Sequence, residues 1–264
     1  MLPVIKAQAY GNDFLYVEDR LVPGRDRPVL ARALCDRHLG VGADGLILYA
    51  RTARGASMQL LNADGSHSEV SGNGVRGLAA VLVDAHGFEP VNDVVVISTD
   101  AGEKRLELLA RNGKRLTFCA AMGQPTAPAD VTLEVGGRAL QVVTLRVGNP
   151  QCVRLESSLD EDRVRQWGPL LERHSHFPEG TNVEFAAVEA PDRVRILIWE
   201  RGVGPTLASG TGACAAAVAA AAFGGASRDV QVTSPGGTQR VEWREDGLYL
   251  TGWAELVLMG EWVG

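Results

Sequence analysis

The residues of this chain best suited to chemistry stand in two short stretches rich in glycine and serine. One of them, Ser209-Gly210-Thr211-Gly212, precedes eleven apolar residues that run without a break to Phe223. Eleven residues span about 16 Å as a helix, too little for a bilayer, so we expect a helix buried in a protein core. The first N–H groups of a helix have no partner within it, and glycines let another group approach them closely. The stretch therefore predicts a site for an anion such as a carboxylate, and the alternative interpretation is an ordinary serine N-cap.

The same arrangement occurs a second time in the chain. Ser71-Gly72-Asn73-Gly74 lies 138 positions earlier and opens an apolar segment that predicts a helix over 75–85. Other glycine and polar residues recur at this spacing, the last pair after a one-residue slip: Asn62 with Glu200, Gly42 with Gly180, Asp44 with Asn182, and Gly11-Asn12 with Gly148-Asn149. The recurrence predicts a duplicated half of about 130 residues, hence two similar domains whose polar residues converge on one site.

The composition indicates a globular protein with a small ligand. Of the 264 residues 45% are apolar, and a net charge of −6 gives no basic surface for nucleic acid. The N-terminus lacks a charged leader followed by a long apolar run, so we expect a cytoplasmic location and no membrane partner. The four cysteines, Cys35, Cys119, Cys152 and Cys214, have neither CxxC spacing nor a nearby histidine pair. They are interpreted as buried thiols, and no metal and no disulfide framework are expected.

Between the two stretches the chain alternates short strands with glycine turns. Hairpins are predicted along 94–119 and meandering strands along 230–259. Helices are predicted over 29–37 and 161–171, in addition to the two apolar ones. The segment 123–129, which has two prolines and no apolar periodicity, is the expected crossing between the halves.

One pattern in the first half imitates a nucleotide site. Gly72, Gly74 and Gly77 match the dinucleotide-binding glycine spacing, and the acidic Asp93 follows about twenty positions later. That motif should follow directly on a parallel strand within a βαβ unit, whereas the residues after Leu61 are a polar turn. We therefore expect no nicotinamide and no other cofactor.

Seven motifs in order make the whole chain similar to the diaminopimelate epimerase family. They are Gly11-Asn12-Asp13-Phe14, Gly42-Ala43-Asp44-Gly45, Asn62-Ala63-Asp64-Gly65-Ser66, Gly72-Asn73-Gly74-Val75-Arg76, Gly148-Asn149-Pro150, Glu200-Arg201-Gly202-Val203-Gly204 and Gly210-Thr211-Gly212-Ala213-Cys214-Ala215-Ala216. The resemblance implies an α+β fold of two pseudo-twofold-related domains, each a curved, mostly antiparallel sheet around a central buried helix. With the duplication, it predicts one domain from 1–118 plus 254–264 and a second from 119–253.

The resemblance also implies a cofactor-independent reaction in which one cysteine removes the α-proton of an amino acid and another returns a proton to the opposite face. Serines stand at both of these positions here, Ser71 and Ser209. Gln151 replaces a histidine that is usual after Gly-Asn-Pro, and Pro205 replaces a residue that is commonly acidic. Because a hydroxyl loses its proton far less readily than a thiol, the family's proton-transfer route is expected to be weakened or altered.

The expected substrate-binding residues are retained. By the resemblance, Asn12, Asn62, Asn149, Asn182, Glu200 and Arg201 hold the amino and distal carboxylate groups of the substrate, with backbone N–H groups of Gly72, Asn73, Gly210 and Thr211 at the helix ends. Arginine can fork a carboxylate and glutamate can accept from an ammonium group, as a zwitterion requires. The alternatives are turn roles for the asparagines and a solvated surface pair for Glu200-Arg201.

Two hypotheses of function follow. The first is an isomerase that converts LL- to meso-diaminopimelate, a precursor of lysine and peptidoglycan, with activity weakened or altered by Ser71 and Ser209. The second is a catalytically inactive amino-acid-binding or sensor paralogue that kept the site and lost the chemistry. In either case the partner is a small amino acid, and the expected assembly is a homodimer.

Overall fold

The computed structural model describes all 264 residues, and the chain forms two compact units. Unit 1 comprises Met1–Ala120 and Gly252–Gly264, and unit 2 comprises Ala121–Thr251. The chain changes unit within strands β8 (Arg115–Gly123) and β17 (Gly247–Trp262). The first of these changes lies after Ala120, inside β8, which continues as a strand up to Gly123. The sequence predicts the crossing slightly later, in the proline segment 123–129.

Unit 1 is built from a sheet and two α-helices. Its elements, with the parts of β8 and β17 that belong to it, are β1 (Leu2–Ala9), β2 (Asn12–Glu18), α1 (Arg27–Cys35), β3 (Gly45–Thr52), β4 (Gly55–Asn62), β5 (His67–Ser68), α2 (Gly72–Ala80), β6 (Val94–Thr99) and β7 (Gly102–Asn112). Short helical segments follow β2 at Asp19–Leu21 and α2 at Val81–Ala85.

The strands of unit 1 close into a ring. Going round it, β1 pairs with β2, β2 with β3, β3 with β4, β4 with β6, β6 with β7, β7 with β8, β8 with β17, and β17 with β1. The β2–β3 and β4–β6 pairs are parallel. The β1–β2, β3–β4, β6–β7, β7–β8 and β17–β1 pairs are antiparallel. A closed ring leaves no open edge and surrounds its interior with side chains.

Unit 2 repeats the order of elements seen in unit 1. It contains β9 (Ala129–Val135), β10 (Arg138–Val147), β11 (Asn149–Leu155), α3 (Glu161–Glu172), β12 (Asn182–Ala190), β13 (Arg193–Glu200), β14 (Gly204–Thr206), α4 (Gly210–Phe223), β15 (Asp229–Ser234) and β16 (Gly237–Arg244). The two parallel pairs recur at the corresponding places, β11 with β12 and β13 with β15. The shared order agrees with the duplication inferred from the sequence.

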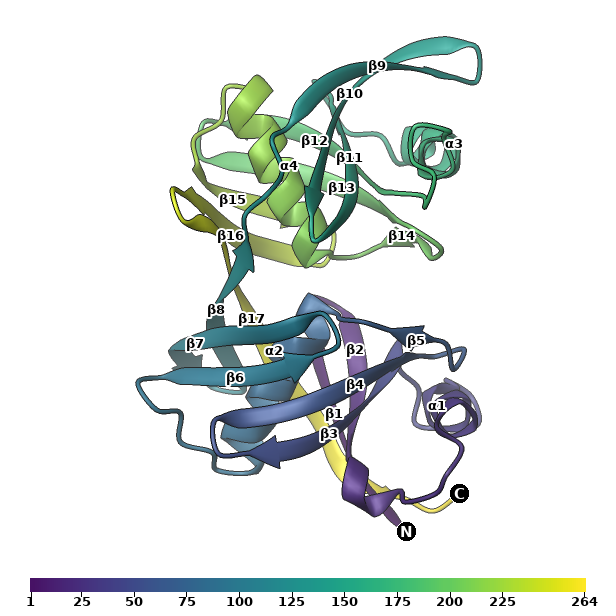
Figure 1. Cartoon of the computed structure of the whole chain (residues 1–264), viewed down its shortest axis with the longest axis vertical. Helices are drawn as coiled ribbons and strands as arrows, with labels where there is room; N and C mark the ends of the chain where they lie inside the picture. Colours follow the sequence, from purple (N-terminus) through teal and green to yellow (C-terminus); the bar gives the residue numbers. More distant parts are fainter. The chain divides into compact units, whose positions relative to one another are not determined.

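The central helix of each unit lies against the concave face of its own strands (Figure 1). In α4 every residue from Gly212 to Ala220 is buried, in a core with the aliphatic side chains of β10 to β13 and β15 to β17. In α2 every residue from Asn73 to Ala80 is buried. Small alanine and glycine side chains let sheet residues approach the helix from all sides, as the uniformly apolar sequence predicts. The fold is therefore the predicted α+β arrangement, a mostly antiparallel sheet around a central helix in each unit.

Local signals explain where the helices begin and end. The side chain of Asp26 caps α1 by accepting from the Val29 N–H, Pro28 lies in its first turn, and Asp160 caps α3. The helix predicted over 75–85 begins earlier, at Gly72, and changes at Val81 into a π-helical turn. The helix predicted over 29–37 lies at Arg27–Cys35, since Asp36 leaves helical geometry.

Candidate active-site residues in the two units

Both central helices begin at a serine that caps them. Ser71 Oγ accepts a hydrogen bond from the Gly74 N–H at 3.1 Å, and Ser209 Oγ accepts from the Gly212 N–H at the same distance. Each serine has extended backbone geometry, as an N-cap requires. The sequence is compatible with an ordinary N-cap or with an anion site, and the structure shows the cap at both helices. The other N–H groups of the first turn have no partner within the helix and point out of its end.

In unit 1 a chain of hydrogen bonds leads from the buried interior to the surface. Arg76, only 1% exposed, donates from Nη1 to Asn73 Oδ1 at 3.1 Å. Asn73 Nδ2 in turn donates to Asn12 Oδ1 at 3.3 Å, and Asn12 Nδ2 donates to Asp44 Oδ2 at 2.7 Å. The structure thus brings together Asn12 and Asn73, which the sequence predicted as binding residues. The sequence did not assign a role to Arg76, although a buried arginine on an otherwise apolar helix is a signal that could have indicated one.

The outer end of this chain is a cluster of charges. Asp13 forms ion pairs with Lys6 and Arg37, both at 2.8 Å, and Arg37 also pairs with Asp44 at 2.8 Å. Burial of Asp13 favours its neutral form, but the hydrogen bonds from Arg37 and Lys6 outweigh that effect and lower the pKa of the carboxyl. The cluster fixes the turn between β1 and β2 that carries Asn12.

Asn62 does not join this network. Its Nδ2 donates to Ser66 Oγ at 2.9 Å, and its N–H donates to the Ser66 carbonyl at 2.8 Å. These bonds close the turn after β4, which is the turn role that the sequence left open. A substrate contact from Asn62 remains a prediction.

In unit 2 the Gln151 side chain lies at the centre of the polar residues. Gln151 is fully buried, and its amide is 2.6 Å from Asn149 Oδ1. Thr211 Oγ1 and Asn182 Nδ2 each lie 3.2 Å from the same end of the amide as Asn149, and the other end lies within 3.2 Å of both Glu184 oxygens. The structure therefore brings together three predicted binding residues, Asn149, Asn182 and Thr211. It adds Glu184, which the sequence did not single out.

The predicted pair Glu200-Arg201 lies at the end of β13. The Arg201 N–H donates to Asn182 Oδ1 at 2.9 Å, and its Nη1 donates to the Glu179 carbonyl at 2.8 Å. Glu200 is partly buried. The pKa of the buried Glu184 carboxyl is raised mainly by its burial and further by the negative charge of Glu200. The Arg201 backbone is thus held by Asn182, while its side chain is exposed.

The two serines lack an evident base. The hydrogen bond found for each hydroxyl oxygen is the one accepted from its own helix, with no histidine, lysine or carboxylate bonded to it. The histidines with side-chain partners bond elsewhere, His86 to Tyr49 and His67 to Asp100. The buried thiols offer no substitute, because burial raises the pKa of Cys35 to about 12 and also raises that of Cys152.

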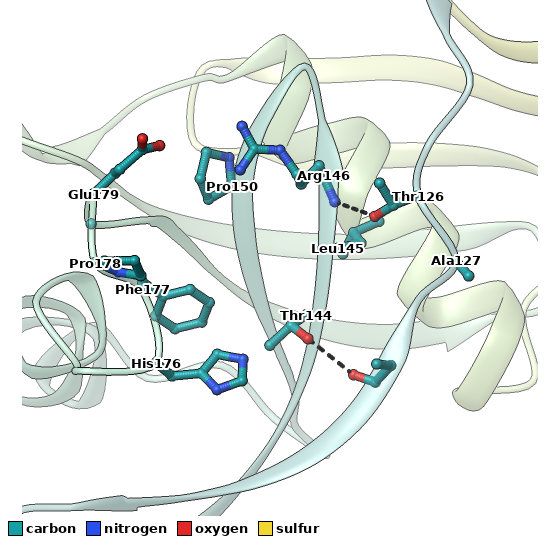
Figure 2. Close-up of a pocket in the computed structure, with 12 residues that line it drawn as sticks. Thr126, Ala127, Thr144, Leu145, Arg146, Pro150, His176, Phe177, Pro178 and Glu179 are labelled. Atoms are coloured by element: carbon teal, nitrogen blue, oxygen red, sulfur yellow. Dashed lines mark hydrogen bonds between the residues drawn. The ribbon is translucent and has the colours of Figure 1, made fainter.

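A surface hollow of about 440 Å³ lies in unit 2 beside β9 and β10 (Figure 2). Its lining includes Arg146, His176, Phe177 and Glu179, and it contains none of the residues predicted as site residues. We find no group of three metal-binding side chains in the chain. No helix has the length and apolar character needed to cross a membrane.

Comparison with solved structures shows which proteins share this fold. A crystal structure of a probable proline racemase from Agrobacterium radiobacter superposes with a TM-score of 0.73 at 17% identity, covering 100% of this chain and 93% of that one. A hydroxyproline epimerase from Agrobacterium vitis gives a TM-score of 0.68 at 16% identity, covering 98% and 90%. At these identities the likeness shows the fold alone, which this chain shares with a probable proline racemase and a hydroxyproline epimerase.

Sequence comparison then gives the family. The model of the family "Diaminopimelate epimerase" matches residues 4–127 and 143–257. The diaminopimelate epimerase of Desulforudis audaxviator is 42% identical over 275 residues, covering 98% of both chains, and that of Synechocystis is 38% identical, covering 97% of both. The chain belongs to the diaminopimelate epimerase family, a family of isomerases.

Proposed function

We propose that this chain binds diaminopimelate or a closely related amino acid and interconverts its LL and meso forms slowly. The relatives of similar length are diaminopimelate epimerases, which supports this substrate. In unit 2, Asn149, Asn182 and Thr211 gather around one amide, and the Arg201 backbone N–H donates to Asn182 Oδ1. Such a set offers amide oxygens and a carboxylate for an ammonium group, and N–H groups with a guanidinium for a carboxylate.

We infer the slow rate from the hydrogen bonds of the two serine hydroxyls. Each hydroxyl oxygen is a helix cap with no base bonded to it. A positioned acid or base contributes about 10² to 10⁴ in rate when its pKa suits the working pH, and a neutral hydroxyl supplies little of that. Ser71 and Ser209, at the positions matching the family's acid and base, therefore bind and orient but transfer protons poorly.

The same observation supports a second candidate, an amino-acid-binding or sensor protein without catalysis. The backbone N–H groups of Gly72, Asn73, Gly210 and Thr211 belong to the helix ends and do not depend on a thiol at the cap. Binding can therefore persist where the chemistry is lost.

A pair of cysteine substitutions tests the chemistry. Ser71→Cys combined with Ser209→Cys should restore α-proton exchange with deuterated solvent and inversion of diaminopimelate, because a helix N-terminus lowers the pKa of a thiol. Each single variant should restore less, since inversion needs a base on one face and an acid on the other. Exchange is followed by NMR and inversion by chiral chromatography, with Ser234→Cys, a buried serine outside the helix ends, as the matched control.

The outcomes separate the two candidates. Restoration in the double variant supports the isomerase. Retained binding with no exchange in any variant supports the sensor, and fast inversion by the unmodified chain would show that the hydroxyls are competent after all.

Binding itself is tested by thermal unfolding. A ligand present at a hundredfold excess over its Kd adds about 2.7 kcal/mol to the free energy of unfolding. We expect a clear rise in Tm with meso- or LL-diaminopimelate and a smaller one with lysine or proline. No shift with any amino acid at millimolar concentration would contradict both candidates.

A cytoplasmic location and a homodimer belong to the same proposal. Val257 and Met259, which alternate on β17 and are more than half exposed, provide apolar surface that a second copy could cover. Met259→Lys should then shift the protein from dimer to monomer in sedimentation analysis, and an unchanged sedimentation coefficient would rule out that surface.

A further inference from the structure

A carboxylic acid is buried against the first turn of α4. Glu184, in β12, has no exposed surface, and a Cβ placed on Gly212 would lie 2.5 Å from Glu184 Oε1. A buried carboxylate is costly unless it is paired with a cation or well hydrogen-bonded. The polar side chain beside Glu184 is an amide, that of Gln151.

The duplication shows that packing does not require an acid here. Gly74 has the same place in α2 that Gly212 has in α4, three residues after the capping serine. A Cβ on Gly74 would meet the Ile47 Cδ1 methyl group, at 2.9 Å. Unit 1 thus fills with an aliphatic side chain the place where unit 2 keeps a carboxyl group. A chemical role is therefore the better explanation for Glu184.

The Gln151 amide can be placed in two orientations by exchanging its oxygen and nitrogen, and each suits one charge state of Glu184. With Oε1 toward Glu184, the amide oxygen can accept a hydrogen bond only from a protonated carboxyl, and Nε2 donates to Asn149 Oδ1 at 2.6 Å. With Nε2 toward Glu184, at 3.1 and 3.2 Å, it can donate to an ionised carboxylate. In that second orientation Oε1 accepts from Thr211 Oγ1 and from Asn182 Nδ2, both at 3.2 Å. The Asn149 amide must then turn as well, so that its nitrogen rather than Oδ1 faces Gln151 Oε1 at 2.6 Å.

The two orientations differ in what they leave for a ligand. When Gln151 Oε1 accepts from Thr211 and Asn182, both donors are used within the protein. When Oε1 faces a protonated Glu184, the Thr211 hydroxyl and the Asn182 amide are released to donate elsewhere. Both belong to the residues proposed above to receive the amino acid.

We propose that Glu184 is a positioning residue whose protonated form turns the Gln151 amide and so frees Thr211 and Asn182 to bind a carboxylate of the ligand. The inference rests on the proposed function, because the ligand is the amino acid proposed there. No bond is made or broken apart from the transfer of one proton between Glu184 and solvent.

The surroundings of Glu184 favour the protonated form. Of the titratable groups on the elements packed against β12, the buried or partly buried ones are Glu200 of β13, Cys152 and Arg154 of β11, Cys214 of α4 and Glu172 of α3. Glu172 is engaged with Trp199 Nε1 at 2.7 Å and the Gly202 N–H at 3.0 Å. Burial and the negative charge of Glu200 both raise the pKa of Glu184, so its neutral form extends to higher pH than for an exposed glutamate.

The test compares ligand affinity over pH in matched variants. The Kd of meso-diaminopimelate, measured by calorimetry from pH 5 to 9, should rise in the unmodified chain by up to about tenfold per pH unit above the pKa of Glu184. Glu184→Gln, whose amide can donate to Gln151 Oε1 at any pH, should bind like the unmodified chain at low pH and lose this dependence. Glu184→Leu, which resembles the packing in unit 1, should bind weakly at every pH. Glu172→Gln, which changes a buried acid not in contact with Gln151, should retain the pH dependence.

A measurement without ligand separates the inference from the proposed function. Infrared difference spectra between the unmodified chain and Glu184→Gln should show the C=O stretch of a protonated carboxyl, and its titration should coincide with a shift of the Gln151 side-chain amide in NMR. An identical pH dependence of Kd in the unmodified chain and Glu184→Gln would overturn the inference and leave the proposed function intact. Coupled titration without binding of any amino acid would overturn the proposed function and support the link between Glu184 and Gln151.

Discussion

At the scale of single residues, Ser71 and Ser209 stand at the caps of the two central helices, where the resemblance to the family predicts cysteines. Serine is the better N-cap, and each oxygen accepts from a helix N–H. Cysteine is the better base, because its thiolate forms within the physiological pH range at a helix end. The residues that would hold the ligand are not affected by this exchange.

We expect Arg201 to contribute more to ligand binding than to the stability of the fold. Arg201→Ala should weaken binding of diaminopimelate by about 1.5 to 3 kcal/mol, the range for hydrogen bonds to charged groups. Its exposed guanidinium has one backbone partner, the Glu179 carbonyl, so the free energy of unfolding without ligand should fall by much less. Calorimetry and urea unfolding give the two values. The control Arg193→Ala removes an exposed arginine at the start of the same strand and should change neither ligand affinity nor the free energy of unfolding. Equal losses of binding and of stability in Arg201→Ala would show that Arg201 is structural.

The charges around Asp13 make a pH-dependent contribution to stability. The folded-state pKa of Asp13 is lowered, so its ionised form stabilises the protein above the unfolded value near 4, and this is lost as the pH falls below it. Asp13→Asn should therefore be less stable than the unmodified chain at pH 7, with the difference shrinking below about pH 4. Urea midpoints at pH 7 and pH 3 measure the change. The control Asp192→Asn, in an exposed turn, should have the same urea midpoint as the unmodified chain at both pH values. A loss of stability in Asp13→Asn that is the same at pH 7 and pH 3 would contradict the prediction.

At the scale of elements, the central helices depend on how closely the strands approach them. Tyr16 of β2 is fully buried, and its hydroxyl donates to the Gly74 carbonyl in the first turn of α2 at 3.0 Å. A Cβ on Gly77 would overlap Tyr16 Oη and lie 3.0 Å from Cζ. The glycine is therefore needed for packing rather than for an unusual backbone angle.

Gly77→Ala should destabilise unit 1 by about 1 to 3 kcal/mol, because a buried tyrosine must move. Tyr16→Phe in the same chain should recover part of the loss, since it removes the oxygen that overlaps the new methyl group. Thermal and urea unfolding measure both variants. Gly72→Ala, at a place in the same helix with no atom within 4 Å of the new Cβ, is the matched control and should cost little. Equal effects of the two alanines would contradict the packing argument.

At the scale of the whole molecule, the chain builds one continuous unit and one discontinuous unit. Unit 2 runs from Ala121 to Thr251 without interruption, whereas unit 1 needs the last thirteen residues, Gly252–Gly264, to complete its ring. The end of β17 pairs with β1, from Leu2 opposite Trp262 to Gln8 opposite Glu255. The two chain termini consequently lie near each other in unit 1 (Figure 1).

Removing residues 252–264 should unfold unit 1 while leaving unit 2 folded. The truncation takes away a strand that closes the ring, and it exposes the backbone groups of β1 and β8. Hydrogen exchange followed by mass spectrometry should show loss of protection in 1–120 and retention in 121–251. Removing only 263–264, which lie beyond the pairing, should leave both protected, and protection of 1–120 in the longer truncation would show that the ring is not required.

Features that depend on residues close together along the chain, or on a repeated pattern, could be predicted without the structure. The largely apolar segment after Ser71 and the uniformly apolar run after Gly212 predict two buried helices, and glycine and polar residues that recur at one spacing predict the duplication; the structure shows two buried helices and a repeated order of elements. Seven ordered motifs were enough for the family, which the comparisons confirm. These signals are local, and they do not require knowledge of which strands pair.

Contacts between residues on neighbouring strands could not be predicted in this way. Parallel pairing of β11 with β12 sets Gln151 opposite Asn182 and thereby brings Glu184 against the amide that Thr211 also contacts. In the sequence Glu184 is one polar residue within an apolar strand, and Gln151 is only a departure from a motif. Likewise Asn62 resembles the other asparagines in the sequence, yet its hydrogen bonds close its own turn. The strand register determines these contacts, and register is a property of the assembled sheet rather than of any one segment.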